Sequence, residues 1–244
     1  MKTVILGRRV LNQLIRDRWF LAFSFIAPIL VIVVLNIFFN TFPDQFPVEN
    51  YIVGIAATVV FVITFVLSMI SIVEERVNGT LQRMFVNGVS RITIIGGYLL
   101  GYLVIATIQA IIVIFLTLNL FELDMTGDTI ATLILAILLL AIASVALGLL
   151  ISSFVRRQVQ IIPFIPMVML PTIFLSGIIV EVNKLPVPAQ VIGQITPLYY
   201  TNSIIDLIST SAWELSEVIP DIISLIGIIL FVMFLSSLTL KPAE

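Results

Sequence analysis

The sequence predicts an all-α integral membrane protein, on the evidence of its composition, its long apolar runs and its uneven charge distribution. Of its 244 residues, 60% are hydrophobic and only 11% are charged, and the mean hydropathy is +1.22. A soluble domain usually carries about 25% charged residues. Apolar runs such as LILAILLLAIASVALGLL, residues 133–150, are continuous and do not alternate. Such runs favour helices that cross the ~30 Å hydrocarbon core over the alternating strands of a membrane β-barrel.

Six stretches are long enough to cross a bilayer as helices, and no internal repeat or linker divides the chain. We therefore expect a single transmembrane domain over residues 1–244. The predicted spans are residues 19–40, 51–73, 92–118, 129–153, 161–180 and 219–240. Because the number of spans is even, both ends of the chain are expected on the same side of the membrane.

The charged residues predict which side that is. With the N-terminus inside, the inner segments hold 11 of the 12 Lys and Arg residues and four of the 14 acidic residues, a net charge of +7. The outer segments hold Lys184 and ten acidic residues, a net charge of −9. Cytoplasmic loops carry the excess of Lys and Arg. We therefore expect a plasma-membrane protein with both termini in the cytoplasm.

The residue types that are missing exclude several kinds of site. The chain has no Cys and no His, which excludes disulfides, Cys/His zinc sites and Ser-His-Asp triads. Lys2 is the only Lys that is followed by Ser or Thr, and no Gly precedes it, so the chain has no G-x-x-x-x-G-K-[ST] phosphate loop. Its basic residues are scattered instead of forming a nucleic-acid-binding patch. We expect no catalytic residue, no cofactor or metal bound by this chain, and no nucleic acid partner.

Residues 1–18 predict an amphipathic helix that lies in the inner membrane interface. At 100° per residue, one side is apolar and holds Val4, Val10, Leu11, Leu14 and Ile15. The other side is polar and holds Lys2, Arg9, Asn12, Gln13 and Arg16. Ile5 and Leu6 depart from this pattern. The simpler alternative is a basic flank next to the first span.

The long outer segment, residues 181–218, predicts short helices that dip back into the outer leaflet. Pro186, Pro188 and Pro197 divide it into stretches that are mostly apolar, whereas a loop in water would be more polar. The span before it contains three prolines, at positions 163, 166 and 171. That span is therefore expected to be kinked and packed against neighbours that satisfy its freed carbonyl groups.

Small and polar residues within the spans indicate helix contacts. Gly97-x-x-x-Gly101 and Ser144-x-x-x-Gly148 predict close approach of another helix. Three polar side chains, Asn36, Thr64 and Gln109, are candidates for a substrate path. The alternative is that they hydrogen-bond to neighbouring helices, as most polar residues in membrane spans do.

The inner segment between the second and third spans, EERVNGTLQRMFVNGVSR at residues 74–91, concentrates charge between two apolar runs. Asn78 can cap the start of a short helix and Gly88 can end it, and Ser90 can cap the following span. Leu81, Met84 and Phe85 fall on one face of that helix. A helix of about two turns is marginal alone, so this face needs a partner. The membrane surface, the protein's own helices and another protein all remain open.

Several motifs, taken in order, resemble a known family. E-x-R-x-x-G-T-L occupies residues 74–81, and S-R follows at 90–91. F-L-S-G, L-P and T-P-L-Y-Y begin at residues 174, 185 and 196. With six predicted spans and a basic N-terminal helix, nearly the whole chain resembles the permease subunits of type 2 ABC transporters. The chain departs from the usual family pattern at Gln82, Gly88 and residues 180–181.

The resemblance implies roles for particular residues. The segment at 74–91 would be a coupling helix seated on a cytosolic ATPase. Its expected contact residues are Glu74, Glu75, Arg76, Asn78, Gly79, Thr80, Leu81, Arg83, Met84 and Phe85. The outer segment before the last span would form an external gate. Its expected residues are Ser176, Gly177, Pro186, Pro197, Tyr199 and Tyr200.

These observations favour the permease half of an exporter for a lipophilic or amphipathic compound. The resemblance implies a second permease subunit, contact with membrane lipid, and ATP with Mg²⁺ held by a separate cytosolic ATPase. Carboxylates are almost absent from the predicted spans, except near their ends, which disfavours an ion-coupled secondary transporter. A membrane scaffold or assembly subunit that transports nothing is the other alternative.

Overall fold

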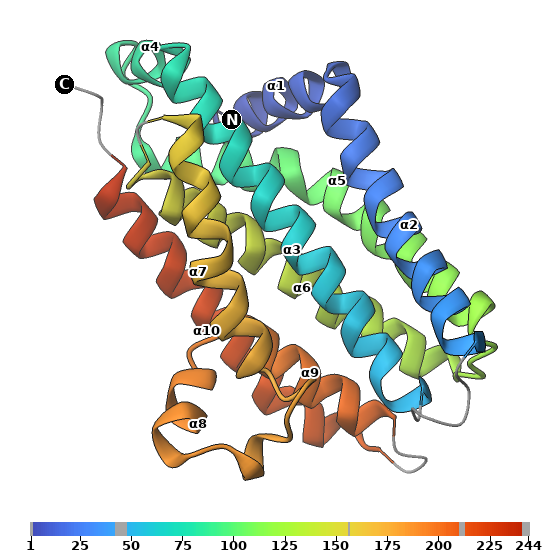
Figure 1. Ribbon diagram of the computed structural model, residues 1–244. Helices are drawn as coiled ribbons and strands as arrows, with labels where there is room; N and C mark the ends of the chain where they lie inside the picture. The colour runs from blue at the N-terminus through green and yellow to red at the C-terminus, as the bar shows by residue number, and fades with distance from the viewer. Residues whose placement is uncertain (1, 42–47, 156, 210–212, 241–244) are drawn as a thin grey trace.

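The computed structural model describes the chain except residues 1, 42–47, 156, 210–212 and 241–244, and it does not describe the side chains of residues 48–50. The described residues form helices, turns and loops, with no strand among them. Figure 1 shows a bundle of long helices with short helices at both ends. The predicted all-α class is confirmed.

Five helices are long and apolar enough to cross a membrane within the described part of the chain. They are α2 (Arg18–Thr41), α3 (Val48–Val77), α5 (Arg91–Leu120), α6 (Gly127–Ser152) and α10 (Leu215–Thr239). The shorter α-helices are α1 (Lys2–Arg16), α4 (Thr80–Val86), α7 (Ile161–Phe174), α8 (Val187–Gly193) and α9 (Pro197–Ile208). Two 3-10 helices complete the order, η1 (Gln158–Gln160) and η2 (Val182–Lys184).

The predicted span at residues 161–180 differs from the other five. Helix α7 has 14 residues, and at 1.5 Å per residue it is about 21 Å long, less than the ~30 Å hydrocarbon core. It ends at Phe174, and the following turn contains Gly177 at φ 94°. A residue in this left-handed region cannot continue a helix, which explains why the span is shorter than its apolar composition suggests. Six full-length spans are therefore not confirmed.

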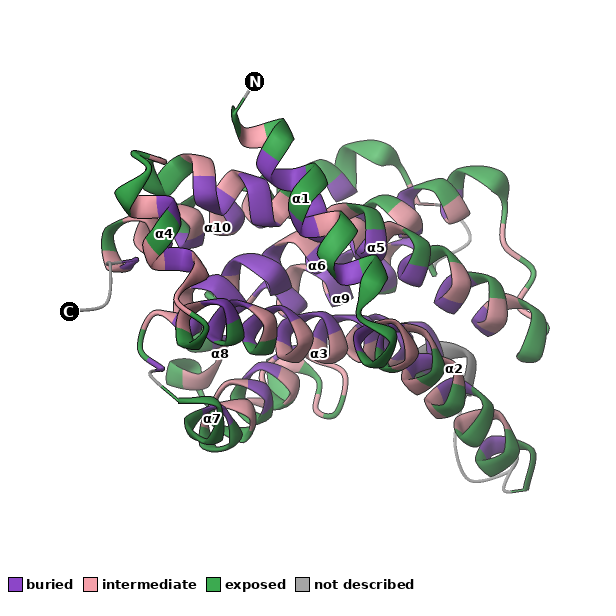
Figure 2. Cartoon of the chain, turned by 90° about the horizontal axis from the view of Figure 1, so that it is seen from above, coloured by how far each residue is buried: buried purple, intermediate pink, exposed green. Residues whose placement is uncertain are grey.

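Helices α3 and α6 form the centre of the bundle, where small residues let them approach closely. A Cβ atom at Gly148 would lie 2.2 Å from the Ser68 hydroxyl oxygen, so only glycine fits there. Large side chains of α3, such as Phe61 and Phe65, are fully buried around this contact. Figure 2 shows the buried residues facing these central helices and exposed residues along α2 and α7. The predicted contact at Ser144-x-x-x-Gly148 is confirmed.

Helix α1 packs across α5 through the second predicted glycine pair. A Cβ atom at Gly97 would lie 2.6 Å from Cγ of Leu6, and one at Gly101 would lie 2.7 Å from Cγ1 of Val10. The amphipathic helix is present as Lys2–Arg16, and its location in the membrane interface stays a prediction; its predicted apolar face is partly wrong. Its buried residues are Leu6, Gly7, Val10 and Leu14, whereas Val4 and Ile15 are exposed. The glycine groove of α5 rotates the buried face toward Leu6.

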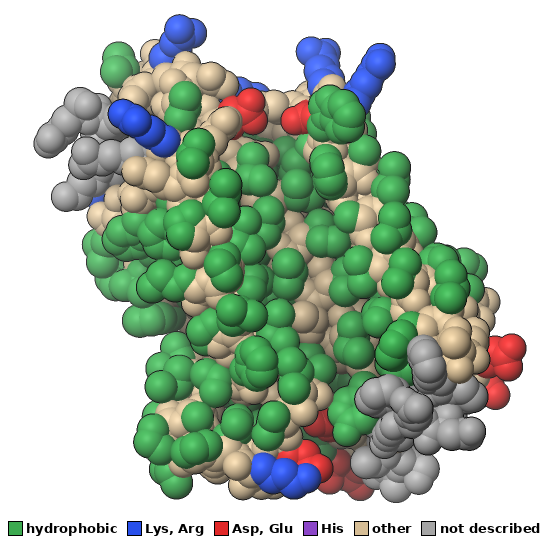
Figure 3. Space-filling model, viewed as in Figure 1, with side chains coloured by type: hydrophobic (Ala, Val, Ile, Leu, Met, Phe, Trp, Pro, Cys, Tyr) green, Lys and Arg blue, Asp and Glu red, His purple; other side chains and the backbone are tan. Residues whose placement is uncertain are grey.

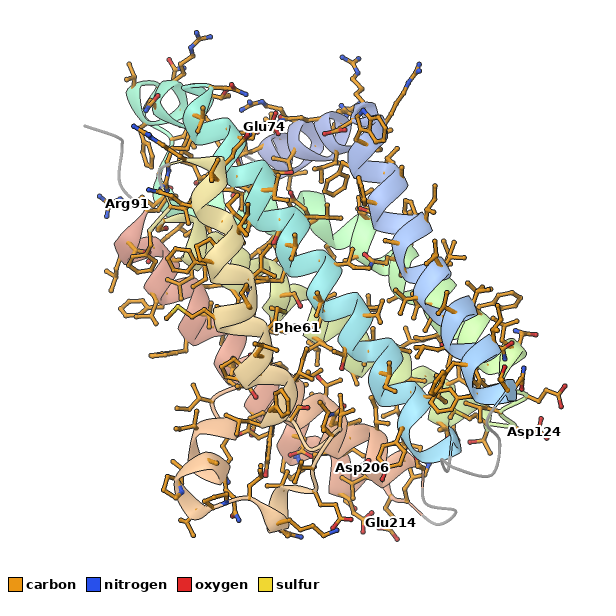
Figure 4. The ribbon with its side chains drawn as sticks, viewed as in Figure 1. Phe61, Glu74, Arg91, Asp124, Asp206 and Glu214 are labelled. Atoms are coloured by element: carbon orange, nitrogen blue, oxygen red, sulfur yellow. The ribbon has the colours of Figure 1, made fainter. Side chains whose placement is uncertain are left out.

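Charge separates the two ends of the bundle. Figure 3 shows Lys and Arg side chains at the end that carries α1 and α4, and we call this the basic end. The opposite end carries α8, α9 and most acidic residues, and we call it the acidic end. Figure 4 places Glu74 and Arg91 at the basic end and Asp124, Asp206 and Glu214 at the acidic end. Arg156 and Lys241 of the predicted inner set and Asp44 of the outer set lie outside the described residues. Which end faces the cytoplasm stays a prediction.

Candidate functional site

Helix α4, between α3 and α5 at the basic end, is the centre of the candidate site. Its bounds follow from two residues with positive φ, Gly79 at 72° and Gly88 at 70°. Gly79 is the N-cap residue and no side chain caps the helix, so the predicted cap by Asn78 is wrong. The predicted Ser90 cap of α5 is confirmed, since the Thr93 amide donates to the Ser90 hydroxyl oxygen at 3.3 Å.

The apolar face of α4 is buried against the protein's own helices. Leu81 is 1% exposed and Met84 is 6% exposed, and Phe85 is half-buried. Leu81 and Met84 join a hydrophobic cluster with Leu6 and Val10 of α1. Of the three partners that the sequence left open, the structure shows the protein's own helices. The short helix is thus held in place by tertiary packing, which supplies the stability that two turns lack.

A polar contact set adds to this packing, and we call Arg9, Glu75, Met84 and Tyr98 the clamp. Glu75 is 4% exposed and accepts a hydrogen bond from the Tyr98 hydroxyl group. Arg9 lies 3.9 Å from the Glu75 carboxylate, and it donates to the Met84 sulfur at 3.4 Å. A buried carboxylate is costly unless it is paired and hydrogen-bonded. The clamp meets that need and joins α1, α3, α4 and α5.

Arg76 is turned toward the end of α6. Its Nη1 donates to the carbonyl oxygens of Ser152 at 2.7 Å, Ser153 at 3.2 Å and Val155 at 3.1 Å. The last carbonyl groups of a helix have no partner within it and carry partial negative charge, so a guanidinium group is well placed there. Sequence reasoning missed this contact, because its partners lie 76 to 79 residues away.

The remaining residues of the predicted contact set face outward. Glu74, Asn78 and Arg83 are exposed, and Gly79 and Thr80 are half-buried. Two apolar residues that the sequence analysis did not select are also exposed, Val77 at 56% and Val86 at 88%. We use the name outer α4 surface for Arg83 and Val86 of α4 together with Glu74 and Val77 at the end of α3. The sequence does contain a signal for Val86. It directly follows Phe85, so it falls off the apolar face of the short helix and is expected to be exposed.

The predicted gate residues gather at the acidic end. Ser176 is buried, and its carbonyl oxygen accepts a hydrogen bond from Asn202 of α9 at 3.1 Å. Pro186 is the N-cap residue of α8 and Pro197 is the first residue of α9. The rings of Tyr199 and Tyr200 meet edge to face with centroids 5.1 Å apart. The predicted short helices of this segment are present, and their re-entry into the membrane stays a prediction.

The structure brings together two of the three candidate path residues. The Thr64 hydroxyl group of α3 donates to the Gln109 side chain of α5 at 3.3 Å, and both side chains are buried. They line a cavity of about 10 Å³, which suits a single water molecule. Asn36 lies elsewhere and donates to the Leu120 carbonyl oxygen at 2.7 Å. In this conformation these contacts are between helices, as the packing alternative expects.

A larger hollow lies at the acidic end. It has a volume of about 1010 Å³ and is lined by the connection from α5 to α6 and by the start of α10. Glu122, Asp124 and Asp128 line it, and Trp213 closes one side with a 3.1 Å hydrogen bond to the Thr129 hydroxyl oxygen. It lies at the opposite end from α4, so it contributes nothing to the outer α4 surface.

Comparison with known proteins agrees with this architecture. Residues 1–210 match the family described as ABC-2 type transporter. ABC transporter G family member 20 of Dictyostelium discoideum is 29% identical over 133 residues, which cover 54% of this chain and 18% of that protein. Probable multidrug ABC transporter permease YbhR of Escherichia coli strain K12 is 28% identical over 160 residues, which cover 62% of this chain and 43% of that protein. The match thus spans less than half of either relative. Because the family match covers most of this chain, the protein is a multi-pass membrane protein that belongs to the ABC-2 type transporter family.

Proposed function

We propose that the chain is the permease half of an ABC-type exporter. It moves a lipophilic or amphipathic compound across the plasma membrane, using ATP that a separate cytosolic subunit hydrolyses with Mg²⁺. A second permease subunit completes the path, and the basic end with both termini faces the cytoplasm. The observation that carries the proposal is the two-sided character of α4, which is clamped to the bundle on one side and exposes Val86 on the other.

The inner side of α4 gives it the means to transmit force. Leu81 and Met84 belong to a hydrophobic cluster that includes residues of α1, α3 and α5, and the clamp adds polar contacts to the same three helices. Close-packed side chains resist deformation, so a push on α4 moves its neighbours with it. Arg76 extends the connection to the end of α6. An ATPase that displaces α4 would therefore tilt several spans together.

The outer α4 surface gives the ATPase a place to bind. Val86 and Val77 are apolar side chains exposed at an end that is otherwise rich in Lys and Arg. Arg83, which lies three residues before Val86 on α4, can pair with an acidic residue of the partner. Apolar contacts surrounded by charged residues are typical of protein–protein interfaces. The buried and half-buried residues under this surface would then hold it in position. They are Glu75, Arg76, Leu81 and Met84.

The substrate class rests on the family and on the printed name of one relative. The Escherichia coli protein is named a probable multidrug permease, and we extend that substrate class to this chain as a proposal. Alternating access would follow from rocking of the spans when the ATPase pair closes. The turn at Ser176 and Gly177, together with α8 and α9, would open and close the path at the acidic end.

The test is co-purification of the permease with its ATPase and measurement of ATP-dependent export. Val86→Asp is expected to reduce both at least tenfold, because it buries an unpaired charge in the interface. Val159→Asp is the matched control, since Val159 is a valine of η1 with a similar exposure of 75%. Both variants should insert in the membrane normally. Normal binding and export by Val86→Asp would disprove the assignment of α4 as the coupling element.

A further inference from the structure

A small pocket at the acidic end has unusual chemistry. It lies between the start of α3, the turn after α7, and α9, and has a volume of about 40 Å³. Tyr51 and Gly54 of α3, Gly177 of the turn, and Asn202 and Asp206 of α9 line it. Asn202 and Asp206 are four residues apart on a helix and therefore lie on the same face. Figure 4 shows Asp206 at this end of the bundle.

Asn202 offers a buried oxygen atom with no partner. The side chain is 4% exposed, and its Nδ2 donates to the Ser176 carbonyl oxygen at 3.1 Å. Because a carbonyl oxygen only accepts hydrogen bonds, this contact fixes which amide atom is nitrogen. Oδ1 therefore points the other way, toward Gly54, and it has no hydrogen-bond partner among the described residues. Most buried polar atoms in native structures are hydrogen-bonded, so this oxygen is expected to accept a hydrogen bond from a ligand.

Asp206 adds a negative charge that no described side chain neutralises. It forms no ion pair within the described residues. Lys184, the basic residue that the sequence places at this end, is already paired with Glu181 at 2.9 Å. Desolvation raises the pKa of the Asp206 carboxyl group from its ordinary value of 3.8. Asp206 is nevertheless an exposed residue that lines the pocket, so its carboxyl group also borders solvent, and no described cation compensates its charge.

We propose that this pocket binds a small cationic hydrogen-bond donor, an ammonium group. Its N–H groups would be shared between Oδ1 of Asn202 and the carboxylate of Asp206. A volume of about 40 Å³ admits about three groups of the size of water, so the pocket fits a primary ammonium group and is too small for a quaternary one with its substituents. The ligand is either free ammonium or the head of a larger primary amine. Binding here depends on neither the ATPase nor transport.

The test is the apparent melting temperature of the purified chain in detergent, measured with methylammonium chloride. At a concentration 100-fold above the dissociation constant, the melting temperature is expected to rise by about 5 °C. Tetramethylammonium chloride and NaCl at equal ionic strength should give no such rise. Ammonium chloride and hexylamine distinguish free ammonium from the head of a larger amine. Only a pocket that opens to larger amines will bind hexylamine as well as ammonium.

Three variants locate the effect. Asp206→Asn removes the charge and should abolish the rise. Gly54→Ala should also abolish it, because the new Cβ atom would lie 3.3 Å from Oδ1 of Asn202 and 3.4 Å from Cγ1 of Ile178, inside the pocket. It leaves both acceptors intact, so it remains informative if changes at Asn202 prevent folding. Gly227→Ala in α10 is the matched control, since a Cβ atom there meets nothing within 4 Å.

The proposal is overturned if tetramethylammonium or NaCl stabilises the protein as much as methylammonium does. That result would show a general effect of salt and a pocket that holds only water. It is also overturned if Gly54→Ala and Asp206→Asn keep the full rise, because ammonium would then bind elsewhere. The site is supported if Asp206→Asn and Gly54→Ala remove the rise in melting temperature while Gly227→Ala keeps it.

Discussion

Helices α4 and α8 are both seven residues long and lie at opposite ends of the bundle, but they are attached to it very differently. Helix α4 buries Leu81 and Met84, whereas the buried residue of α8 is Gly193. Apolar side chains of α8 such as Val191 are exposed instead. The comparison shows that α4 is anchored to the bundle by buried side chains, whereas the side chains of α8 are mostly exposed.

The same contrast holds for two carboxylates. Glu75 at the basic end is almost fully buried but accepts a hydrogen bond from Tyr98 and faces Arg9. Asp206 at the acidic end has no ion-pair partner among the described residues. The charge of Glu75 is therefore satisfied within the protein, whereas we propose an external cation for Asp206.

The largest expected effect separates the two short helices. Leu81→Ala should lower the free energy of unfolding by about 2–5 kcal/mol, because it leaves a cavity under α4. Val191→Ala on α8 should change it by no more than about 0.5 kcal/mol, since that side chain is already exposed. Melting curves in detergent measure both. Equal losses would remove the distinction between an anchored and a loosely attached helix.

The next largest change in stability distinguishes Arg76 from Arg83, two arginines of the same segment. Arg76→Ala should cost about 2–3 kcal/mol of stability, because three carbonyl groups at the end of α6 lose a charged donor. Arg76→Lys should restore part of this, as an ammonium group reaches fewer of them. Arg83→Ala should leave stability unchanged and weaken ATPase binding, because Arg83 is exposed. If Arg83→Ala lowers stability more than Arg76→Ala does, the assignment of Arg76 to the inner side and Arg83 to the outer side is wrong.

A smaller effect tests the clamp. Tyr98→Phe should cost about 1–2 kcal/mol, because the buried Glu75 loses its hydroxyl donor while the ring is kept. Tyr199→Phe at the acidic end is the matched control, and its edge-to-face contact with Tyr200 is retained. Melting temperatures of the two variants give the difference. A loss at Tyr199 as large as that at Tyr98 would contradict a special role for the clamp.

The smallest effect concerns pH at the acidic end. Because the pKa of Asp206 is raised in the folded state, the folded protein holds this proton more tightly than the unfolded chain. The resulting stability is fully present below the ordinary pKa of 3.8 and is lost as the pH rises through the raised value. Without added ammonium ions, Asp206→Asn should therefore gain stability relative to the native chain across that interval. A gain that grows instead as the pH falls would have the wrong sign.

The local features of the fold could be predicted from the sequence, because their causes are local. The long apolar runs predicted the helices, Ser90 predicted the cap of α5, and Gly97 and Gly101 predicted a close contact between helices. The length of α7 was overestimated, since composition does not report the positive φ of Gly177. The direction of the α4 face could not be predicted either. Two turns carry too little periodicity to show whether Leu81 faces lipid, a partner protein or the chain's own helices.

The partners of charged side chains were also beyond the sequence. Arg76 binds carbonyl groups 76 to 79 residues away, and Arg9 meets Glu75 only because α1 lies across α5. Motif resemblance selected the segment at residues 74–91 and assigned Glu74, Glu75, Arg76 and Arg83 to one interface. Burial divides that set into residues that hold α4 and residues that are free to bind.

Cysteine cross-linking tests the central claim most directly, and the chain contains no native Cys to interfere. Single cysteines at Val86, Leu81 and Val159 would be treated with a short thiol cross-linker in the presence of the ATPase. We expect Val86→Cys to cross-link to the ATPase and to lose reactivity toward a soluble maleimide when the complex forms. Leu81→Cys should be unreactive, and Val159→Cys should react equally with and without the ATPase. If Val86→Cys stays fully reactive in the complex and forms no cross-link, the outer α4 surface is not the docking site.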